Sequence, residues 1–355
     1  MRILVAAGGS GGHVFPALAV LEELHREGIH TLGWIGRPEG LEARIAKNRP
    51  WIEFLPLKTY GLPRDRPWTW PVALAKNFRA LAQARRLVWA FSPDVVLAMG
   101  GYPAVAPALA AKSLGIPVVL HEQNAVMGLA NRFLARFADF VLLGFPNTSG
   151  CPTGAKTVYT GTPVRREFTE IPETLGDELL VLGGSLGSRA LVDGVLEAAP
   201  ALAKLFDISL RLVVGRAGDP ATIEKKLRSV GLKASVHPFT EGLAELLAQA
   251  RLVLSRAGGS TLAELTCAGR PAVLVPWNGA ANAHQKKNAA FFQQKGACVL
   301  LQDRDLRSPK FSSLISQLWR NEKTLVRLGA AARAWARPDA TKKVAEIVKS
   351  VGRGK

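Results

Sequence analysis

The length, composition and charge of the chain limit what it can be. Its 355 residues are too many for one comfortable hydrophobic core and predict two domains, while a hydrophobic content of 48% excludes a disordered protein. A net charge of +18 predicts attraction to polyanions such as nucleic acid, anionic lipid or phosphorylated substrates, unless the basic surface serves only solubility. The apolar runs are short or broken by glycine and proline, so neither a secretory signal nor a membrane-spanning helix is expected.

In chain order, apolar runs that alternate with helical patterns predict a parallel sheet in each half of the chain. Strands are expected in the first half at 3–7, 31–35, 95–99, 118–121 and 140–143. The second half repeats this plan, with a helix from about Arg189 and strands at 179–182, 210–214, 234–238, 252–255, 272–275 and 297–301. A final helix at 341–351 follows Pro338, and we expect it to return to the first domain.

The predicted fold class is therefore α/β, with two doubly wound, Rossmann-like domains that face each other across a cleft. The first domain covers residues 1–160 and takes in the C-terminal helix at 341–355. The second covers residues 161–340, and the turn-rich segment 160–165 forms the joint. In this fold class ligands bind outside the carboxyl ends of the strands.

A glycine-rich segment at 8–12 follows the first strand and precedes His13 and a helix that Pro16 is expected to open. The N–H groups of such a turn converge on one spot, where the helix dipole favours an anion or an electron-rich oxygen. His13 places a side chain that titrates near neutral pH at the lip of this turn. The segment matches neither the dinucleotide motif Gly-x-Gly-x-x-Gly nor the P-loop.

Four consecutive polar residues, His121, Glu122, Gln123 and Asn124, end a predicted strand of the first domain. A buried parallel strand accepts such side chains only at its carboxyl end, where ligands bind. A solvated loop is the alternative.

The segment 255–264 of the second domain combines a strand end, small residues and a helix start. The N–H groups at Gly259 to Thr261, with the hydroxyls of Ser260 and Thr261, are expected to hold a diphosphate, and Glu264 to accept hydrogen bonds from a ribose diol. A capping box between Glu264 and one of these hydroxyls is the alternative. Gln285 follows a loop and is expected to bind sugar hydroxyls.

Metal binding is not expected. The cysteines at 151, 267 and 298 lack the spacing of metal ligands and predict reduced thiols in a cytoplasmic protein. Asp303-Arg304-Asp305 matches a metal-binding pattern, but its place after a strand and before a polar helix start favours a solvated turn. A segment at 150–157 resembles a P-loop, but its spacing is wrong and it contains a proline.

The segment 67–86 predicts a helix that can lie on an anionic bilayer, because it combines aromatic and basic side chains. The alternative is an ordinary helix that packs on the sheet and has a solvated basic face. One helix can also pack on the sheet and contact the bilayer. The side chains expected at the bilayer are Trp68, Trp70, Lys76, Phe78, Arg79, Arg85 and Arg86.

These motifs, taken in order, resemble those of the MurG family of bacterial N-acetylglucosaminyltransferases. The resemblance runs from the first strand to the last helix. It is carried by the segments 8–17, 100–102, 121–124, 161–165, 183–187, 258–264 and 284–289. The loop at 278–283 lacks the acidic residues that the family pattern has before His284-Gln285.

The resemblance implies a GT-B fold and an inverting glycosyltransferase without a cofactor. Its donor would be UDP-GlcNAc, and its acceptor the muramyl 4-hydroxyl of undecaprenyl-diphospho-MurNAc-pentapeptide, so that lipid I becomes lipid II in peptidoglycan synthesis. The enzyme would serve cell-wall biogenesis, cell shape and division as a peripheral protein on the cytoplasmic face of the cell membrane. Its partners would be an anionic membrane surface and, as a further option, other cell-wall enzymes, but not nucleic acid.

By the same resemblance, the second domain holds the UDP-sugar, and the first faces the acceptor and the membrane with Tyr102, His121 and the helix of 67–86. The residues expected to contact the donor are Ser10, Gly11, Gly12, Asn124, Arg165, Ser185, Thr240, Gly259, Ser260, Thr261, Leu262, Ala263, Glu264 and Gln285.

The reaction needs a base for the acceptor hydroxyl, and His13 is our first choice for it, with Glu122 in reserve. A structural cap donated by His13 to the glycine segment is the alternative. Two other functions stay open at this point. A UDP-GlcNAc 2-epimerase of the same fold would need no lipid, and a polyanion-binding protein would bind by charge alone and lose its ligand in salt.

Overall fold

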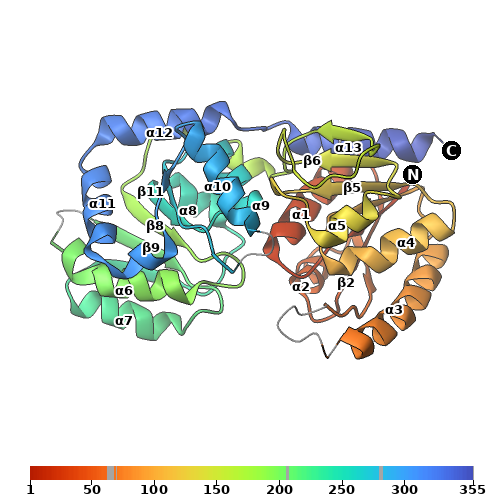
Figure 1. The fold of residues 1–355 in the computed structure, drawn as a ribbon, viewed down its shortest axis with the longest axis horizontal. Coiled ribbons are helices and arrows are strands. Elements are labelled where there is room, and N and C mark those ends of the chain that lie inside the picture. The colour runs from red at the N-terminus through yellow and green to blue at the C-terminus, as the bar shows by residue number, and fades with distance from the viewer. Residues whose placement is uncertain (62–67, 69, 205–207, 280–282, 355) are drawn as a thin grey trace. The chain divides into compact units, whose positions relative to one another are not determined.

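The computed structural model describes residues 1–61, 68, 70–204, 208–279 and 283–354. It divides into two compact units, which Figure 1 shows as ribbons. Unit 1 is Met1–Arg165 with Asp339–Lys355, and unit 2 is Arg166–Pro338. The expected boundaries after residues 160 and 340 lie close to these division points, and the roles expected for the two domains stay predictions.

Unit 1 is built on a seven-stranded sheet in the order β3-β2-β1-β4-β5-β6-β7, in which every neighbouring pair is parallel. Its strands are β1 (Arg2–Ala6), β2 (Thr31–Gly36), β3 (Ile52–Pro56), β4 (Val95–Ala98), β5 (Val118–Glu122), β6 (Phe140–Leu143) and β7 (Thr157–Tyr159). The five expected strands are all present. The edge strands β3 and β7 were not expected, because they are only partly buried and so lack the continuous apolar run of a central strand.

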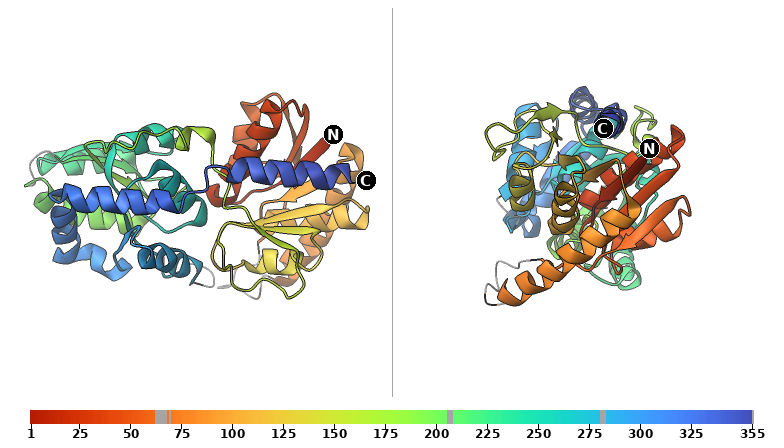
Figure 2. Two further views of the ribbon diagram at one scale, coloured as in Figure 1. Left: turned by 90° about the horizontal axis from the view of Figure 1, so that it is seen from above. Right: turned by 90° about the vertical axis from the view of Figure 1, so that its right-hand side faces the viewer.

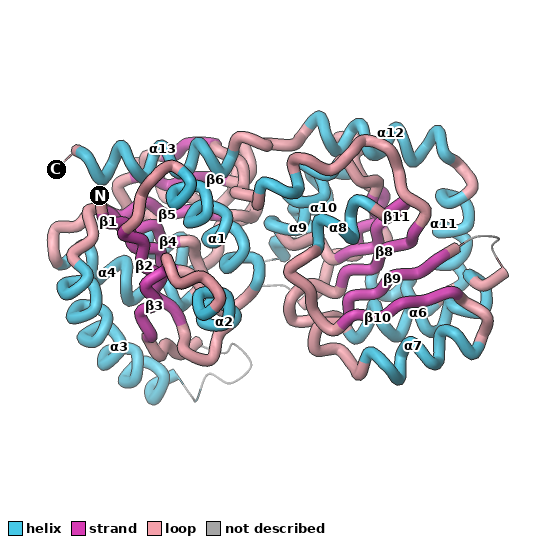
Figure 3. The backbone as a smooth tube through the Cα atoms, turned by 180° about the vertical axis from the view of Figure 1, so that it is seen from behind, coloured by secondary structure: helices cyan, strands magenta, loops and turns pink. Residues whose placement is uncertain are grey.

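Helices cover both faces of this sheet (Figure 3). They are α1 (Gly11–Arg26), α2 (Leu41–Lys47), α3 (Trp70–Phe91), α4 (Val105–Ser113), α5 (Leu129–Leu134) and α13 (Ala340–Arg353). Alternate residues of β1 face opposite sides, so Ile3 and Val5 pack with α1 and α13, while Leu4 and Ala6 pack with α3 and α4.

The expectation that Pro16 opens the first helix is wrong. The helix begins at Gly11, with Ser10 as its N-cap, and Pro16 lies inside it. Proline carries no N–H group, so the carbonyl of Gly12 receives no helical hydrogen bond from it. The missing hydrogen bond falls in the first turns of α1, and the helix continues past it. The glycine segment therefore forms both the turn after β1 and the start of α1.

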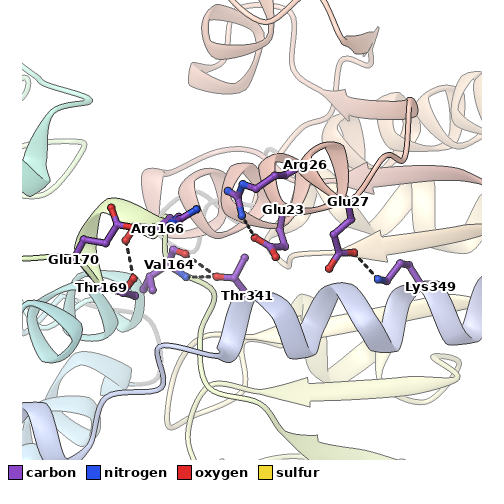
Figure 4. Close-up of polar contacts among 9 residues, drawn as sticks. All are labelled: Glu23, Arg26, Glu27, Val164, Arg166, Thr169, Glu170, Thr341 and Lys349. Carbon is purple, nitrogen blue, oxygen red and sulfur yellow. Dashed lines mark hydrogen bonds and ion pairs between the residues drawn. The ribbon is translucent and has the colours of Figure 1, made fainter.

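The C-terminal helix α13 belongs to unit 1 and packs against α1 (Figure 2). Its apolar side contributes Val344, Ala345 and Val348 to the core that contains β1. At its start, the Thr341 hydroxyl donates to the Val164 carbonyl at 2.6 Å and accepts from the Val164 N–H at 3.0 Å (Figure 4). An ion pair between Lys349 and Glu27 ties its far end to the end of α1 (Figure 4).

Unit 2 repeats the plan with a six-stranded parallel sheet in the order β10-β9-β8-β11-β12-β13. Its strands are β8 (Glu178–Leu182), β9 (Ser209–Val213), β10 (Lys233–His237), β11 (Ala250–Ser255), β12 (Ala272–Leu274) and β13 (Val299–Leu300), all of which were expected. Its helices are α6 (Arg189–Leu202), α7 (Pro220–Ser229), α8 (Leu243–Ala248), α9 (Gly259–Ala268), α10 (His284–Gln294), α11 (Pro309–Trp319) and α12 (Glu322–Ala334). The strand order reverses beside the first strand of each unit, between β1 and β4 and between β8 and β11, which is where this class of sheet binds ligands.

Candidate active site

Three loops of unit 1 meet at the carboxyl edge of its sheet, after β1, β4 and β5. His13 reaches across them, because its Nδ1 lies 3.0 Å from the Met99 carbonyl oxygen and 3.2 Å from Oε1 of Gln123. Gln123 itself donates Nε2 to the Met99 carbonyl at 2.8 Å, so its oxygen faces the imidazole. Both of these contacts of Nδ1 are acceptors, which places the ring proton on Nδ1 and leaves Nε2 as the nitrogen that can take up a proton.

The motif Gly100-Gly101 leaves room for this arrangement. Both glycines have positive φ angles, +90° and +74°, which other residues rarely adopt. A Cβ atom on Gly101 would lie 3.3 Å from Nε2 of His13, and one on Gly100 would lie 2.8 Å from Nδ2 of Asn131. Glycine at both positions therefore lets the loop after β4 pass between His13 and Asn131 of helix α5.

Glu122 is almost fully buried and its carboxylate accepts four hydrogen bonds. Oε1 accepts from the backbone N–H and the side-chain amide of Asn124, both at 3.0 Å. Oε2 accepts from the Gly128 N–H and from Asn131 Nδ2, both at 2.9 Å. Because His121 and Gln123 are also buried, the alternative of a solvated loop at this strand end is wrong. In this geometry Glu122 holds both the loop after β5 and the start of helix α5 in place.

His121 is fully buried, with Nε2 donating to the Gly161 carbonyl at 3.0 Å. Its Nδ1 is also buried and has no hydrogen-bond partner. Burial, opposed by the hydrogen bond to Gly161 and aided by the charge of His13, lowers the pKa of His121 to about 4. The side chain is therefore neutral at physiological pH, and its hydrogen bond links β5 to Gly161 of the segment 160–165.

We expect this buried histidine to make unit 1 less stable in acid. The unfolded state takes up the proton first as the pH falls, because its histidine pKa, 6.5, lies above the folded value of about 4. The stabilising contribution is complete above pH 6.5 and is lost as the pH falls to about 4, a loss of roughly 3 kcal/mol. Urea unfolding of the wild type and of His121→Gln at pH 7, 5.5 and 4 measures this slope. The variant should show a shallower decline, and parallel curves would contradict the assignment.

Unit 2 presents loops after β8, β11 and β12 at the carboxyl edge of its own sheet, and Arg256 connects them. This side chain is buried, and its Nε donates to the hydroxyl of Ser188, the N-cap of α6, at 3.1 Å. Its Nη1 donates to the Val275 carbonyl at 3.0 Å and to Asp303 Oδ1 at 2.6 Å. Arg256 therefore holds three loops together.

The ion pair with Arg256 corrects the sequence analysis of Asp303. Asp303 begins a short 3-10 helix, Asp303–Arg307, and its carboxylate pairs with Arg256 of the loop after β11, so it does not belong to a solvated turn. The sequence analysis did not predict a role for either Arg256 or Asp303. The pattern that could have indicated one is an arginine directly after an apolar strand and before small residues. Among the described residues no group of three or more histidine, cysteine or acidic side chains could hold a metal ion.

Helix α9 starts at Gly259, with Gly258 as its N-cap and without a side-chain cap. The capping-box alternative is therefore wrong, because Ser260 and Thr261 lie inside the first turn. The N–H groups of residues 259–261 belong to the first turn, whose donors have no acceptor within the helix. Glu264, one turn further on, is buried.

Gln285 links two of the same loops. Its Oε1 accepts from the backbone N–H of Ala257 at 3.3 Å and from that of Trp277 at 2.9 Å. The amide can therefore act toward a ligand only as a donor, through Nε2. Residues 280–282 of the preceding loop, which the sequence analysis set apart from the family pattern, lie outside the described residues.

The expected donor contacts are distributed over both units. In unit 1, Arg165 is buried with its guanidinium 5.1 Å from the ring centre of Phe15, and Ser10 to Gly12 start α1. In unit 2, Ser185 lies on the loop after β8, whereas Thr240 follows the edge strand β10 and accepts from the Gly242 N–H at 3.0 Å. Each unit thus gathers its own contacts at one edge, with Thr240 the furthest from the strand-order reversal.

The helix expected at the bilayer is α3, and it both packs and exposes apolar groups. Ala80, Ala84 and Val88 are buried against the sheet, but Phe78 is 74% exposed and Trp89 is 68% exposed. Trp68, Trp70, Lys76, Arg79, Arg85 and Arg86 are exposed as well, whereas residues 67 and 69 lie outside the described residues. None of the helices in the described ranges is long and apolar enough to span a membrane.

The two units match two models of one glycosyltransferase family. Residues 3–143 match the glycosyltransferase family 28 N-terminal domain, and residues 178–351 match its C-terminal domain. With its two Rossmann-like domains, the chain is a glycosyltransferase with the GT-B fold, which confirms the prediction of an α/β protein with two domains of this kind.

Relatives define the family more closely. A protein of Moorella thermoacetica named UDP-N-acetylglucosamine--N-acetylmuramyl-(pentapeptide) pyrophosphoryl-undecaprenol N-acetylglucosamine transferase is 37% identical over 98% of each chain. The crystal structure of Acinetobacter baumannii MurG covers 98% of this chain and 99% of its own, with 32% identity and a TM-score of 0.75. The chain therefore belongs to the MurG family of N-acetylglucosamine transferases.

The epimerase alternative has less support. A solved structure from Listeria monocytogenes, proposed to be a UDP-N-acetylglucosamine 2-epimerase, has a TM-score of 0.69 over 100% of this chain and 97% of its own. At 14% identity, that likeness shows a shared fold and nothing more.

Proposed function

We propose that the enzyme moves N-acetylglucosamine from UDP-GlcNAc to the muramyl 4-hydroxyl of undecaprenyl-diphospho-MurNAc-pentapeptide, converting lipid I to lipid II in peptidoglycan synthesis. The donor and acceptor groups are those in the names of its relatives. The observation that carries the chemistry is the tautomer of the His13 ring: the two acceptors at Nδ1 place the proton there, so Nε2 carries the basic lone pair.

In this reaction the acceptor oxygen attacks C1 of the sugar from the face opposite the leaving group. The bond between C1 and the diphosphate oxygen breaks, the electron pair leaves with UDP, and the hydroxyl proton passes to Nε2 of His13. In unit 2, the first-turn N–H groups of α9 and the helix dipole stabilise the charge that develops on the diphosphate. Arg256 acts as a positioning residue there, since it holds the loops after β8, β11 and β12.

We assign a different role to Glu122. With four hydrogen bonds to its carboxylate, it orients the loop that carries Asn124 and the start of helix α5, which carries Asn131. A base needs an oxygen with room for the proton of the acceptor, and His13 has the simpler geometry for that step.

Glu264→Ala and Gln285→Ala should weaken the use of UDP-GlcNAc and leave the fold intact. Glu264 lies in the second turn of α9 and Gln285 in the first turn of α10, and each is proposed to bind a hydroxyl of the donor. The loss of one hydrogen bond to a charged group costs on the order of 1.5–3 kcal/mol. The measurement is kcat/KM for UDP-GlcNAc, with the exposed Gln294→Ala on the same helix α10 as the matched control for Gln285. A lower melting temperature with unchanged kinetics would assign Glu264 to the packing of α9.

The test of the function is direct incubation of the protein with labelled UDP-GlcNAc and a lipid I analogue. Glycosylated lipid supports the proposal. Epimerised free sugar without glycosylated lipid would favour the epimerase. Binding that collapses in salt and ignores UDP would favour a polyanion-binding protein.

The same proposal puts the enzyme at the cytoplasmic face of the cell membrane as a peripheral protein. What supports it is α3, where exposed aromatic and basic side chains share the solvent side of the helix. Other cell-wall enzymes are candidate partners at that surface.

A further inference from the structure

Beside the glycine segment of unit 1 lies a guanidinium that the mechanism above does not use. Arg37 follows β2 directly, and its half-buried side chain donates Nη1 to the hydroxyl of Tyr102 at 2.9 Å. Within the described part of the chain it forms no ion pair, and the acid nearest in sequence, Glu39, pairs with Lys58 instead. The opposite edge of the guanidinium, Nε and Nη2, makes no hydrogen bond to any described residue.

A buried acid holds the backbone of this arginine in place. The Arg37 N–H donates to Oε1 of Glu42 at 2.9 Å, and Glu42 is completely buried. Its carboxylate packs directly against the backbone of Gly8, where a Cβ atom would clash with it. Glu42 therefore fixes the turn of Arg37 against the glycine segment, which makes the position of Arg37 part of the fold.

The side chain of Tyr102 holds the other end of Arg37, its guanidinium. A Cβ atom on Gly9 would lie 3.9 Å from the Tyr102 ring, and one on Gly61 would lie 3.5 Å from it. The ring thus lies against two glycine backbones, one after β1 and one after β3, and its hydroxyl meets the guanidinium of Arg37. Loops after four strands, β1 to β4, contribute to this arrangement.

We infer that Arg37 and Tyr102 form a subsite for an anionic group of the acceptor, a phosphate or a carboxylate. The Nε–Nη2 edge of arginine matches the two oxygens of either group, and such a pair compensates a half-buried charge. The inference rests on the proposed function, since it takes the acceptor to be a diphosphate-linked muramyl peptide, which carries both kinds of group. Arg37 would then be a determinant of acceptor specificity.

Steady-state kinetics with a lipid I analogue test the subsite. Arg37→Ala should raise the KM for the acceptor about 10-fold, with kcat and the KM for UDP-GlcNAc nearly unchanged. Arg37→Lys should recover only part of this loss, because a lysine ammonium lacks the planar fork. Arg44→Ala, which removes an exposed charge from the neighbouring helix α2, is the matched control and should behave as the wild type.

A double mutant tests the link between the two residues. Tyr102→Phe removes only the hydroxyl that holds Arg37, so it should raise the acceptor KM in the wild type and have no further effect in Arg37→Ala. Additive effects of the two substitutions would show that they act separately and would overturn the shared subsite.

Two competing fragments distinguish the sources of the anion. An alkyl diphosphate and the free pentapeptide are each measured as inhibitors against the acceptor, and Arg37→Ala should weaken one of them about 10-fold. Weaker inhibition of the variant by the alkyl diphosphate assigns the subsite to a phosphate. Weaker inhibition by the pentapeptide assigns it to a carboxylate. Unchanged inhibition and unchanged acceptor KM in an active enzyme would overturn the inference alone, whereas a wild type that glycosylates no acceptor would overturn the proposed function.

Discussion

Replacing His13 by alanine is expected to lower kcat by about 10²–10⁴-fold, the range of general-base assistance, with the affinity for UDP-GlcNAc nearly preserved. The reason is that Nε2 is the only ring nitrogen oriented to accept a proton, since Nδ1 faces the Met99 carbonyl and the Gln123 oxygen. The measurement is kcat over a range of pH, and the acidic limb of the profile should change in the variant.

Two comparisons make this result specific. His30→Ala removes an exposed histidine from the loop after α1 and should leave kcat unchanged. Gln123→Ala leaves the base in place but removes one of its two orienting contacts, so it should lower kcat less than His13→Ala does. A His13→Ala enzyme that keeps most of its kcat would exclude this residue as the base.

Reversing the four basic residues of α3 to glutamate should release the protein from anionic membranes. The four side chains, Lys76, Arg79, Arg85 and Arg86, are all exposed. Each charge near an anionic surface contributes up to about 1 kcal/mol, so loss of the four attractions alone lowers the partition coefficient by as much as about 10³-fold, and the four new repulsions add to this. Sedimentation with anionic vesicles measures the loss, and high salt should produce a similar release in the wild type.

The control for this prediction is a reversal of equal charge in unit 2. Lys225, Lys226, Arg228 and Lys233 are also exposed and lie on or next to α7. An equal loss of binding in both variants would mean that net charge alone matters. Unchanged sedimentation of the α3 variant would remove this helix from the interface. Phe78→Ala should add a smaller loss, because it removes an exposed apolar group from the same helix.

The sequence by itself predicted the sheets well, and the reason is burial. Central strands of a parallel sheet are covered on both faces, so each appears as an unbroken apolar run that local reasoning can find. The edge strands β3 and β7 are covered less completely and lack that signal. The predicted start of α1 was wrong for another reason. Proline is common at helix starts only on average, and here Pro16 lies inside the helix.

In the candidate site, too, the sequence predicted some features and the tertiary structure alone decided others. Glycine turns, the polar strand end at 121–124 and the start of α9 are local features, so the sequence could single out these segments as candidate ligand-binding loops. Which atoms face one another was decided only by the tertiary structure, because the partners are far apart along the chain. His13 and Met99 are 86 residues apart, Arg37 and Tyr102 are 65 apart, and Arg256 and Asp303 are 47 apart. Residue type and spacing do not predict such pairs. The side-by-side pairing of parallel strands brings their carboxyl ends to one edge of the sheet, where loops that are far apart in the sequence can form hydrogen bonds with one another.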